Sequence, residues 1–173
     1  PYFHLGLQSG DDVILKRMKR RHSQGDAIAF CRRVRALRPD AVFGADLIAG
    51  FPTETAVMFD RTLDLIAACG LTYLHVFPYS ERPGTAAARM PPVPVAVRRE
   101  RAARLREAGE LRLRAFLDQR VGTSARVRVE GARSGRSEHF APVTLDRDAV
   151  AGTVVPAHIL RRAGDRLEAR LAA

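Results

Sequence analysis

Residues 42–51 read VFGADLIAGF, a nearly continuous apolar run with a single charge at Asp46. Runs of this kind are typical of strands buried on both faces, as in parallel sheets. The following residues, PTET at 52–55, predict a turn and a helix cap, and Gly70 is a natural stop for the helix that they begin. This stretch therefore predicts a strand of a parallel sheet followed by a helix.

The same order of strand and helix appears on both sides of this stretch. Residues 3–8 alternate between apolar and other residues and end at a Ser-Gly turn, which predicts a short strand. Asp11 and Asp12 suit the amino end of a helix, and a second helix starts near Asp26. Residues 72–79 predict a third strand. Strands and helices at this rhythm indicate βαβ units and an α/β fold.

The apolar residues at helical spacing predict which helix faces are buried. These are Ala27, Phe30, Cys31, Val34 and Leu37 in one helix and Met58, Thr62, Leu65, Ile66 and Cys69 in the next. Cys31 and Cys69 are the two cysteines of the chain, too few for a disulfide framework or a zinc ribbon. We expect both to be buried, reduced thiols, and a cytoplasmic setting is the default.

A long basic helix is predicted over residues 95–118, with Leu105, Ala108, Leu111 and Ala115 on one face. After Gly122 the pattern changes to short alternating strands without helical period, which suggests a small β-barrel. The sequence thus predicts two domains, 1–120 and 121–173.

The charge is unevenly distributed. The net charge is +10, from 29 Lys and Arg against 19 Asp and Glu. Residues 25–97 are neutral, whereas 1–24, 98–120 and 121–173 are each basic, which suits a polyanionic partner such as nucleic acid. The alternative is a compositional bias toward arginine, because 27 of the 29 basic residues are Arg.

The start of the chain is neither an initiator Met nor a signal peptide, and no stretch approaches the roughly 20 apolar residues of a membrane helix. Residues 1–120 offer three parallel strands, whereas a closed α/β barrel takes roughly 250 residues. We therefore expect a fragment of a longer protein, with no membrane partner, whose own missing N-terminal region completes the fold.

Several motifs resemble the radical S-adenosylmethionine (SAM) methylthiotransferases that modify tRNA. They are FHLGLQSGDD at 3–12, LKRMKRR at 15–21, GADLIAGFPTET at 44–55 and YLHVFPYSERPGT at 73–85. The segment GRSEHFAPV at 135–143 resembles the TRAM domain of the subgroup that acts on threonylcarbamoyladenosine beside the anticodon. The resemblance covers nearly the whole chain, in order.

The resemblance implies the C-terminal part of a radical SAM (βα) partial TIM-type barrel, followed by a small all-β, OB-like TRAM barrel. It also implies SAM, 4Fe-4S clusters held by the missing N-terminal part, and tRNA bound through its anticodon stem-loop. Cys31 and Cys69 have neither the spacing nor the loop setting of cluster ligands. We therefore expect no metal ligand, no catalytic residue and no activity in this fragment alone.

The resemblance places two sets of binding residues on this sequence. Those expected to face SAM are Gln8, Ser9, Arg20, Asp46, Gly50, Phe51, Phe77 and Pro78. Those expected to bind RNA, by phosphate contact and base stacking, are Arg126, Arg128, Arg136, His139 and Phe140.

Structural alternatives remain for several of these positions. Residues 8–10 also suit a plain turn, and Arg17, Arg20 and Arg21 a basic helix end. His75 reads as a hydrogen-bonded core histidine, and Phe140 as a core residue. Asp46, in an apolar strand, must be paired or functional.

Two other functions remain open. One is a sister methylthiotransferase acting on isopentenyl-adenosine in tRNA or on a ribosomal protein. The other is a non-catalytic RNA-binding module.

Overall fold

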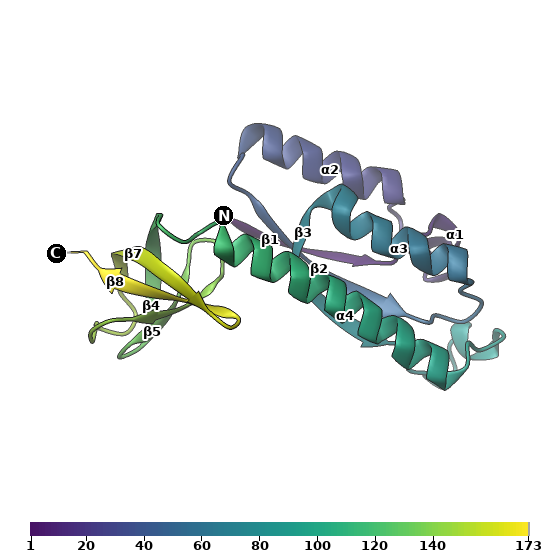
Figure 1. Ribbon diagram of the computed structural model, residues 1–173. Helices are drawn as coiled ribbons and strands as arrows, with labels where there is room; N and C mark the ends of the chain where they lie inside the picture. Colours follow the sequence, from purple (N-terminus) through teal and green to yellow (C-terminus); the bar gives the residue numbers. More distant parts are fainter. Residues whose placement is uncertain (173) are drawn as a thin grey trace. The chain divides into compact units, whose positions relative to one another are not determined.

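The computed structural model describes residues 1–172, and these pack as two compact units. One unit comprises Phe3–Glu110. The other is formed from Leu111 onward together with Pro1–Tyr2. The division lies inside the long helix α4 (Val95–Asp118), between Glu110 and Leu111 (Figure 1).

The first unit alternates strands and helices. Its elements are β1 (Tyr2–Gln8), α1 (Asp12–Arg17), α2 (Gln24–Leu37), β2 (Val42–Ala49), α3 (Ala56–Cys69), β3 (Leu71–Pro78), the short 3-10 helix η1 (Ala87–Arg89) and the first part of α4 (Val95–Asp118). The strands form a sheet in the order β1-β2-β3, and β2 pairs with β3 in parallel. The predicted α/β fold is confirmed.

Helices cover one face of this sheet. The core brings together Leu7, Phe43 and Leu47 from the strands with residues of α2, α3 and α4. The alternate strand residues point away from these helices, because side chains of a strand alternate between faces. The helical residues of this core are Ala27 and Cys31 of α2, Phe59, Leu65, Ile66 and Cys69 of α3, and Ala102 and Leu105 of α4.

Helix ends are capped as the sequence indicates. The Asp11 carboxylate accepts hydrogen bonds from the amides of Val13 and Ile14 at the start of α1. Ser23 and Asp26 form a capping box at α2, and Ser23 lowers the pKa of the Asp26 carboxyl by hydrogen bonding to it. Gly70 ends α3 in the left-handed region with φ of 57°.

Some predicted core positions are wrong. Phe30 and Leu37 of α2 are exposed, since α2 packs through its small residues Ala27 and Cys31. Leu111 is also exposed, because α4 contributes to two cores and changes the face that it buries. Leu105 packs in the first core, whereas Leu113, Phe116 and Leu117 pack in the second.

The second unit is a closed five-stranded barrel. Its strands are β4 (Ser124–Gly131), β5 (Ser134–Ser137), β6 (Pro142–Leu145), β7 (Val154–Ala163) and β8 (Arg166–Leu171), in the order β4-β5-β6-β8-β7. The pair β6 and β8 is parallel, and the other pairs are antiparallel. Val127, Val129, Ile159 and Leu167 are buried inside it. The predicted small β-barrel is confirmed.

Candidate functional site

The turn after β1 holds its backbone in an unusual conformation. Gln8 has a φ of 68°, in a region that side-chain-bearing residues rarely adopt, and the Ser9 amide donates to the Leu7 carbonyl across it at 2.8 Å. The Gln8 side chain is 8% exposed. Backbone of this kind concentrates at ligand sites, because the fold must hold it against its own preference.

Helix α3 fixes this turn. The Gly10 amide donates to the Thr62 hydroxyl at 2.9 Å, and Arg61 pairs with the fully buried Asp11 carboxylate at 2.6 Å. A Cβ on Gly10 would lie 2.4 Å from the Arg61 carbonyl oxygen, so only glycine fits there. The Ser9 hydroxyl is buried and accepts from the Asp11 amide. Ser9 and Gly10 therefore have structural roles in the turn, whatever ligand it meets.

The loop after β2 is held by a buried ion pair. Glu54 Oε1 accepts from the Gly50 amide at 3.0 Å and from Arg101 Nη1 at 2.7 Å. Gly50 has a φ of 72°, and a Cβ there would lie 2.5 Å from Arg98 Cγ. Phe51 is buried and meets the Tyr79 ring edge-on. This loop is thus shaped mainly by its contacts with α4.

The pKa of the Glu54 carboxyl is subject to opposing influences. Burial raises the pKa of the Glu54 carboxyl, although the Gly50 amide and the Arg101 guanidinium oppose this. Its Oε2 is buried and has no hydrogen-bond partner among residues 1–172. A carboxyl in this setting depends on Arg101 to stay ionised.

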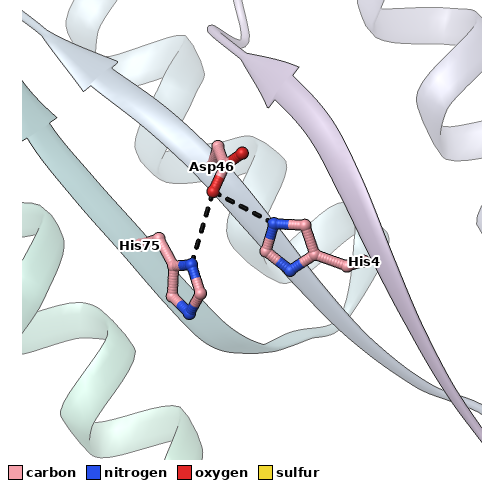
Figure 2. A group of neighbouring side chains, drawn as sticks. All are labelled: His4, Asp46 and His75. Atoms are coloured by element: carbon pink, nitrogen blue, oxygen red, sulfur yellow. Dashed lines mark hydrogen bonds and ion pairs between the residues drawn. The ribbon is translucent and has the colours of Figure 1, made fainter.

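The uncovered sheet face carries a polar cluster (Figure 2). His4 of β1, Asp46 of β2 and His75 of β3 lie on neighbouring strands, and Asp46 pairs directly with His75 in register. Asp46 Oδ1 lies 3.0 Å from His4 Nε2 and 3.4 Å from His75 Nδ1. The expectation that Asp46 is paired is confirmed. The expectation that His75 is a core histidine is wrong, because its side chain is 58% exposed.

Other predicted SAM-facing residues lie on or near the same face. A Cβ on Gly6 would lie 3.8 Å from Gln8 Nε2 and 3.9 Å from Arg20 Nη1, so both side chains come close to the backbone of β1 at Gly6. Phe77 and Pro78, at the end of β3, are exposed. Gln8 and Arg20 thus both lie near Gly6, while Phe51 packs in the interior.

Arg17, the first arginine of the basic helix end, has a partner in the loop after β2. Its guanidinium donates to the Thr53 hydroxyl. This contact joins the end of α1 to the loop that also contains Gly50 and Glu54. Arg17 therefore has a structural role, whereas the Arg20 guanidinium reaches the backbone of β1 near Gly6.

The barrel presents a second candidate surface on β4 and β5. Arg128 and Arg136 are register partners across these strands, and Glu130 lies 2.6 Å from Arg128 and 3.6 Å from Arg136. The Arg136 guanidinium carbon lies 4.5 Å from the centre of the Phe140 ring, which is 44% exposed. Two cations and an aromatic ring thus share one outer surface.

The two remaining residues of the predicted RNA-binding set differ in exposure. Arg126 is exposed on the same face of β4 as Arg128, and its backbone amide donates to Glu138. His139 is buried, and its ring meets Phe116 of α4 edge-on at 6.1 Å between centroids. Phe140 is exposed while the preceding His139 is buried, and the RNA contact expected of His139 stays a prediction.

The two cysteines are buried in the first core, as expected. The neighbouring Cys31 and burial raise the pKa of the Cys69 thiol. An iron–sulfur cluster needs several thiolates at one accessible loop, and the described residues 1–172 do not offer them. Within this same range, no helix is long and apolar enough to cross a membrane.

Comparison with known proteins gives this geometry a context. The chain is 50% identical over 160 residues to the threonylcarbamoyladenosine tRNA methylthiotransferase MtaB of Rickettsia prowazekii, a match that covers 92% of the chain and 38% of that protein. The chain is therefore similar to tRNA methylthiotransferases over the part of them that it spans. The expected resemblance is confirmed, although no protein-family model matches the chain.

Another relative has a different name. The chain is 38% identical over 179 residues to the tRNA-2-methylthio-N(6)-dimethylallyladenosine synthase of Novosphingobium aromaticivorans, covering 99% of the chain and 40% of that protein. The chain thus spans about two fifths of the length of these curated relatives.

A solved structure supports the fold. The radical SAM enzyme coproporphyrinogen III oxidase HemN of Escherichia coli aligns with a TM-score of 0.52 at 18% identity, over 93% of the chain and 41% of HemN.

Two residues that organise the site, His4 and Arg101, were not predicted from the sequence. His4 had a usable signal, since the alternation of residues 3–8 places it on the same face as Gln8. Arg101 had none, because seven other arginines of 98–120 look the same in sequence. Its burial comes from the position of α4 against the loop after β2.

Proposed function

We propose that the chain is the C-terminal part of a cytoplasmic tRNA methylthiotransferase that acts on threonylcarbamoyladenosine beside the anticodon. The observation that carries this is the difference in identity between relatives, 50% to the named threonylcarbamoyladenosine enzyme against 38% to a dimethylallyladenosine synthase. The first unit would bind SAM and the base to be modified, and the barrel would bind RNA.

The open face of the first unit suits SAM chemically. Arg20 offers a guanidinium for a carboxylate, and the Gln8 amide, which also lies near Gly6, offers donors and an acceptor. Phe77 offers an exposed ring for stacking. Bound SAM supplies the methyl group and the 5′-deoxyadenosyl radical of the family reaction. The residues of this chain would bind and orient it, whereas cluster ligands have to come from elsewhere in the whole protein.

The barrel suits RNA as an OB-like TRAM domain. Five-stranded barrels of the OB type bind oligonucleotides on the face of their second and third strands, which correspond to β5 and β6 here. Arg136 lies on β5 beside Phe140, whose ring stacks on Tyr2 at 4.9 Å between centroids, so a phosphate could be held there next to an aromatic pair. The anticodon stem-loop is the RNA that the proposed reaction requires.

The test of the reaction uses the whole protein that contains this chain, produced without oxygen in a bacterium lacking its own enzyme for this modification. We expect mass spectrometry of digested tRNA to show methylthiolated threonylcarbamoyladenosine. Methylthiolated dimethylallyladenosine, or a modified ribosomal protein, would identify a sister enzyme instead. RNA binding without any such product would leave an RNA-binding module.

The test of the barrel surface measures binding of this chain to an anticodon stem-loop by fluorescence anisotropy. We expect Arg128→Ala together with Arg136→Ala to weaken binding and to reduce the slope of log K against log salt by about 2. Arg161→Ala is the matched control, because Arg161 is exposed on β7 of the same barrel and is held in an ion pair, as Arg128 is. Equal losses in both variants would place RNA elsewhere.

A further inference from the structure

The cluster of His4, Asp46 and His75 has the composition of a metal site. Two imidazoles and a carboxylate are the ligands that Zn²⁺ and other divalent first-row ions bind in open, three-residue sites. Among residues 1–172, this is the one place where three His, Cys, Asp or Glu side chains converge, with their ligand atoms within 4.8 Å of one another.

The geometry of the cluster fits a single ion. Ligand atoms placed about 2.0–2.2 Å from zinc lie roughly 3–3.5 Å apart in a tetrahedral site. The distances from Asp46 Oδ1, 3.0 Å to His4 Nε2 and 3.4 Å to His75 Nδ1, lie in that range. The two imidazole rings are 4.9 Å apart between centroids, so small side-chain rotations would bring both nitrogens to one ion.

The backbone holds these ligands in place. Each comes from a different strand of one sheet, and Asp46 and His75 are direct register partners. Sites built on strands are positioned more precisely than sites on loops. Figure 2 shows both imidazoles directed toward the same carboxylate across the sheet.

The cluster is accessible from one side. The side chains of His4 and Asp46 are 35% and 33% exposed, and that of His75 is 58% exposed. An ion could therefore enter from solvent and keep at least one position for water or another small ligand. Open sites of this kind bind exogenous ligands, whereas structural zinc sites are closed by four protein ligands.

We propose that His4, Asp46 and His75 form a binding site for one divalent transition-metal ion, with Zn²⁺ as the probe. This site is distinct from the iron–sulfur clusters of the family, which use thiolates. It is assayed with the metal alone, without SAM or tRNA, so its outcome is separate from that of the proposed function.

The experiment measures Zn²⁺ binding to this chain by calorimetry after treatment with a chelator, and repeats it with Co²⁺ followed by visible absorption. We expect one equivalent to bind. We expect His75→Ala and Asp46→Asn each to weaken binding at least about tenfold, since even residues outside the ligand set of a metal site cost that much. The His158→Ala variant is the matched control, because His158 is an exposed histidine of β7.

Several results would overturn the site. They are absence of stoichiometric binding to the unaltered chain, unchanged affinity in both ligand variants, or an equal loss in the His158 control. Asp46→Asn keeps the size of the side chain, and His75 is exposed, so both variants should fold. Circular dichroism and thermal unfolding check this, and a loss of metal binding counts for the site only in a variant that unfolds like the unaltered chain.

Discussion

The two units use strand alternation differently. In the barrel, β4 alternates visibly, with Val127 and Val129 inside and Arg126 and Arg128 outside. In the sheet of the first unit, β2 reads as one apolar run, although only one of its faces is covered by helices. On the uncovered face of β2, Gly44 and Ile48 carry no polar side chain, so Asp46 is the one polar residue there. A continuous apolar run can therefore contain a site face, and its single polar residue is the one to follow.

The largest effect is expected from breaking the buried ion pair between Arg101 and Glu54 in the first unit. Arg101→Met leaves the Glu54 carboxylate buried without its partner, at a cost of about 3–5 kcal/mol in the free energy of unfolding. Without Arg101, the raised pKa of Glu54 rises further, so its neutral form is favoured in the folded state. The loss of stability relative to the unaltered chain is therefore smaller at pH 5 than at pH 8, because the stability that a raised pKa contributes is lost as the pH rises through that pKa.

Urea unfolding of both proteins at the two pH values measures this effect. The Arg104→Met variant is the control, since the ion pairs of Arg104 are with the exposed Asp60 and Glu100. A loss that is small, or the same at both pH values, would show that Glu54 does not depend on Arg101.

The next largest effect tests whether the two hydrophobic cores unfold independently. Leu65→Ala in α3 and Ile159→Ala in β7 each remove a fully buried side chain and should cost about 2–5 kcal/mol. Because the two clusters share no residue, we expect each loss to fall on its own unit. Hydrogen exchange of peptides from residues 3–110 and 124–171 checks this. If either substitution exposes both sets of peptides equally, the units unfold as one.

A smaller effect tests the capping box of α2. Ser23→Ala removes the hydroxyl that accepts from the Asp26 amide and should cost about 1 kcal/mol. It also removes one cause of the lowered pKa of Asp26, the hydrogen bond from the Ser23 side chain. A lowered pKa contributes stability above the unfolded value that is lost as pH falls, so the difference between variant and unaltered chain should shrink in acid. Thermal unfolding at pH 7 and pH 3 measures it, and a difference that grows in acid would contradict it.

The smallest effect lies on the barrel. Glu130→Gln removes the carboxylate that pairs with Arg128 and Arg136, and should strengthen RNA binding by up to about fivefold, the size of a surface ion pair. Fluorescence anisotropy with an anticodon stem-loop measures this. Asp165→Asn is the control, because it lies in the exposed turn between β7 and β8. An equal gain in the control would mean that net charge alone matters.

Local signals in the sequence predicted most of the fold. Asp11 and Gly70 fixed helix ends, and the alternation of Val127 and Val129 indicated the barrel. These features depend on near neighbours or on strand period, which a sequence displays directly. The sequence leaves both a base-stacking role and a core position open for Phe140, whose ring is exposed, and its RNA contact stays a prediction.

The parts that sequence could not predict depend on distant contacts. The exposure of His75 and its pairing with Asp46 follow from strand register, which joins residues 29 apart in the chain. The burial of Arg101 follows from where α4 crosses the loop at Glu54, which lies 47 positions earlier in the chain. Neither relation leaves a periodic trace in the sequence.

The turn after β1 has a consequence for the order of folding. Its anchors on α3 join Gly10 to Thr62 and Asp11 to Arg61, partners 52 and 50 residues apart. These anchors join residues that are far apart in the chain, so the turn can adopt its final shape only after α3 has docked on the sheet. A substitution that loosens α3 would therefore loosen the turn after β1 as well.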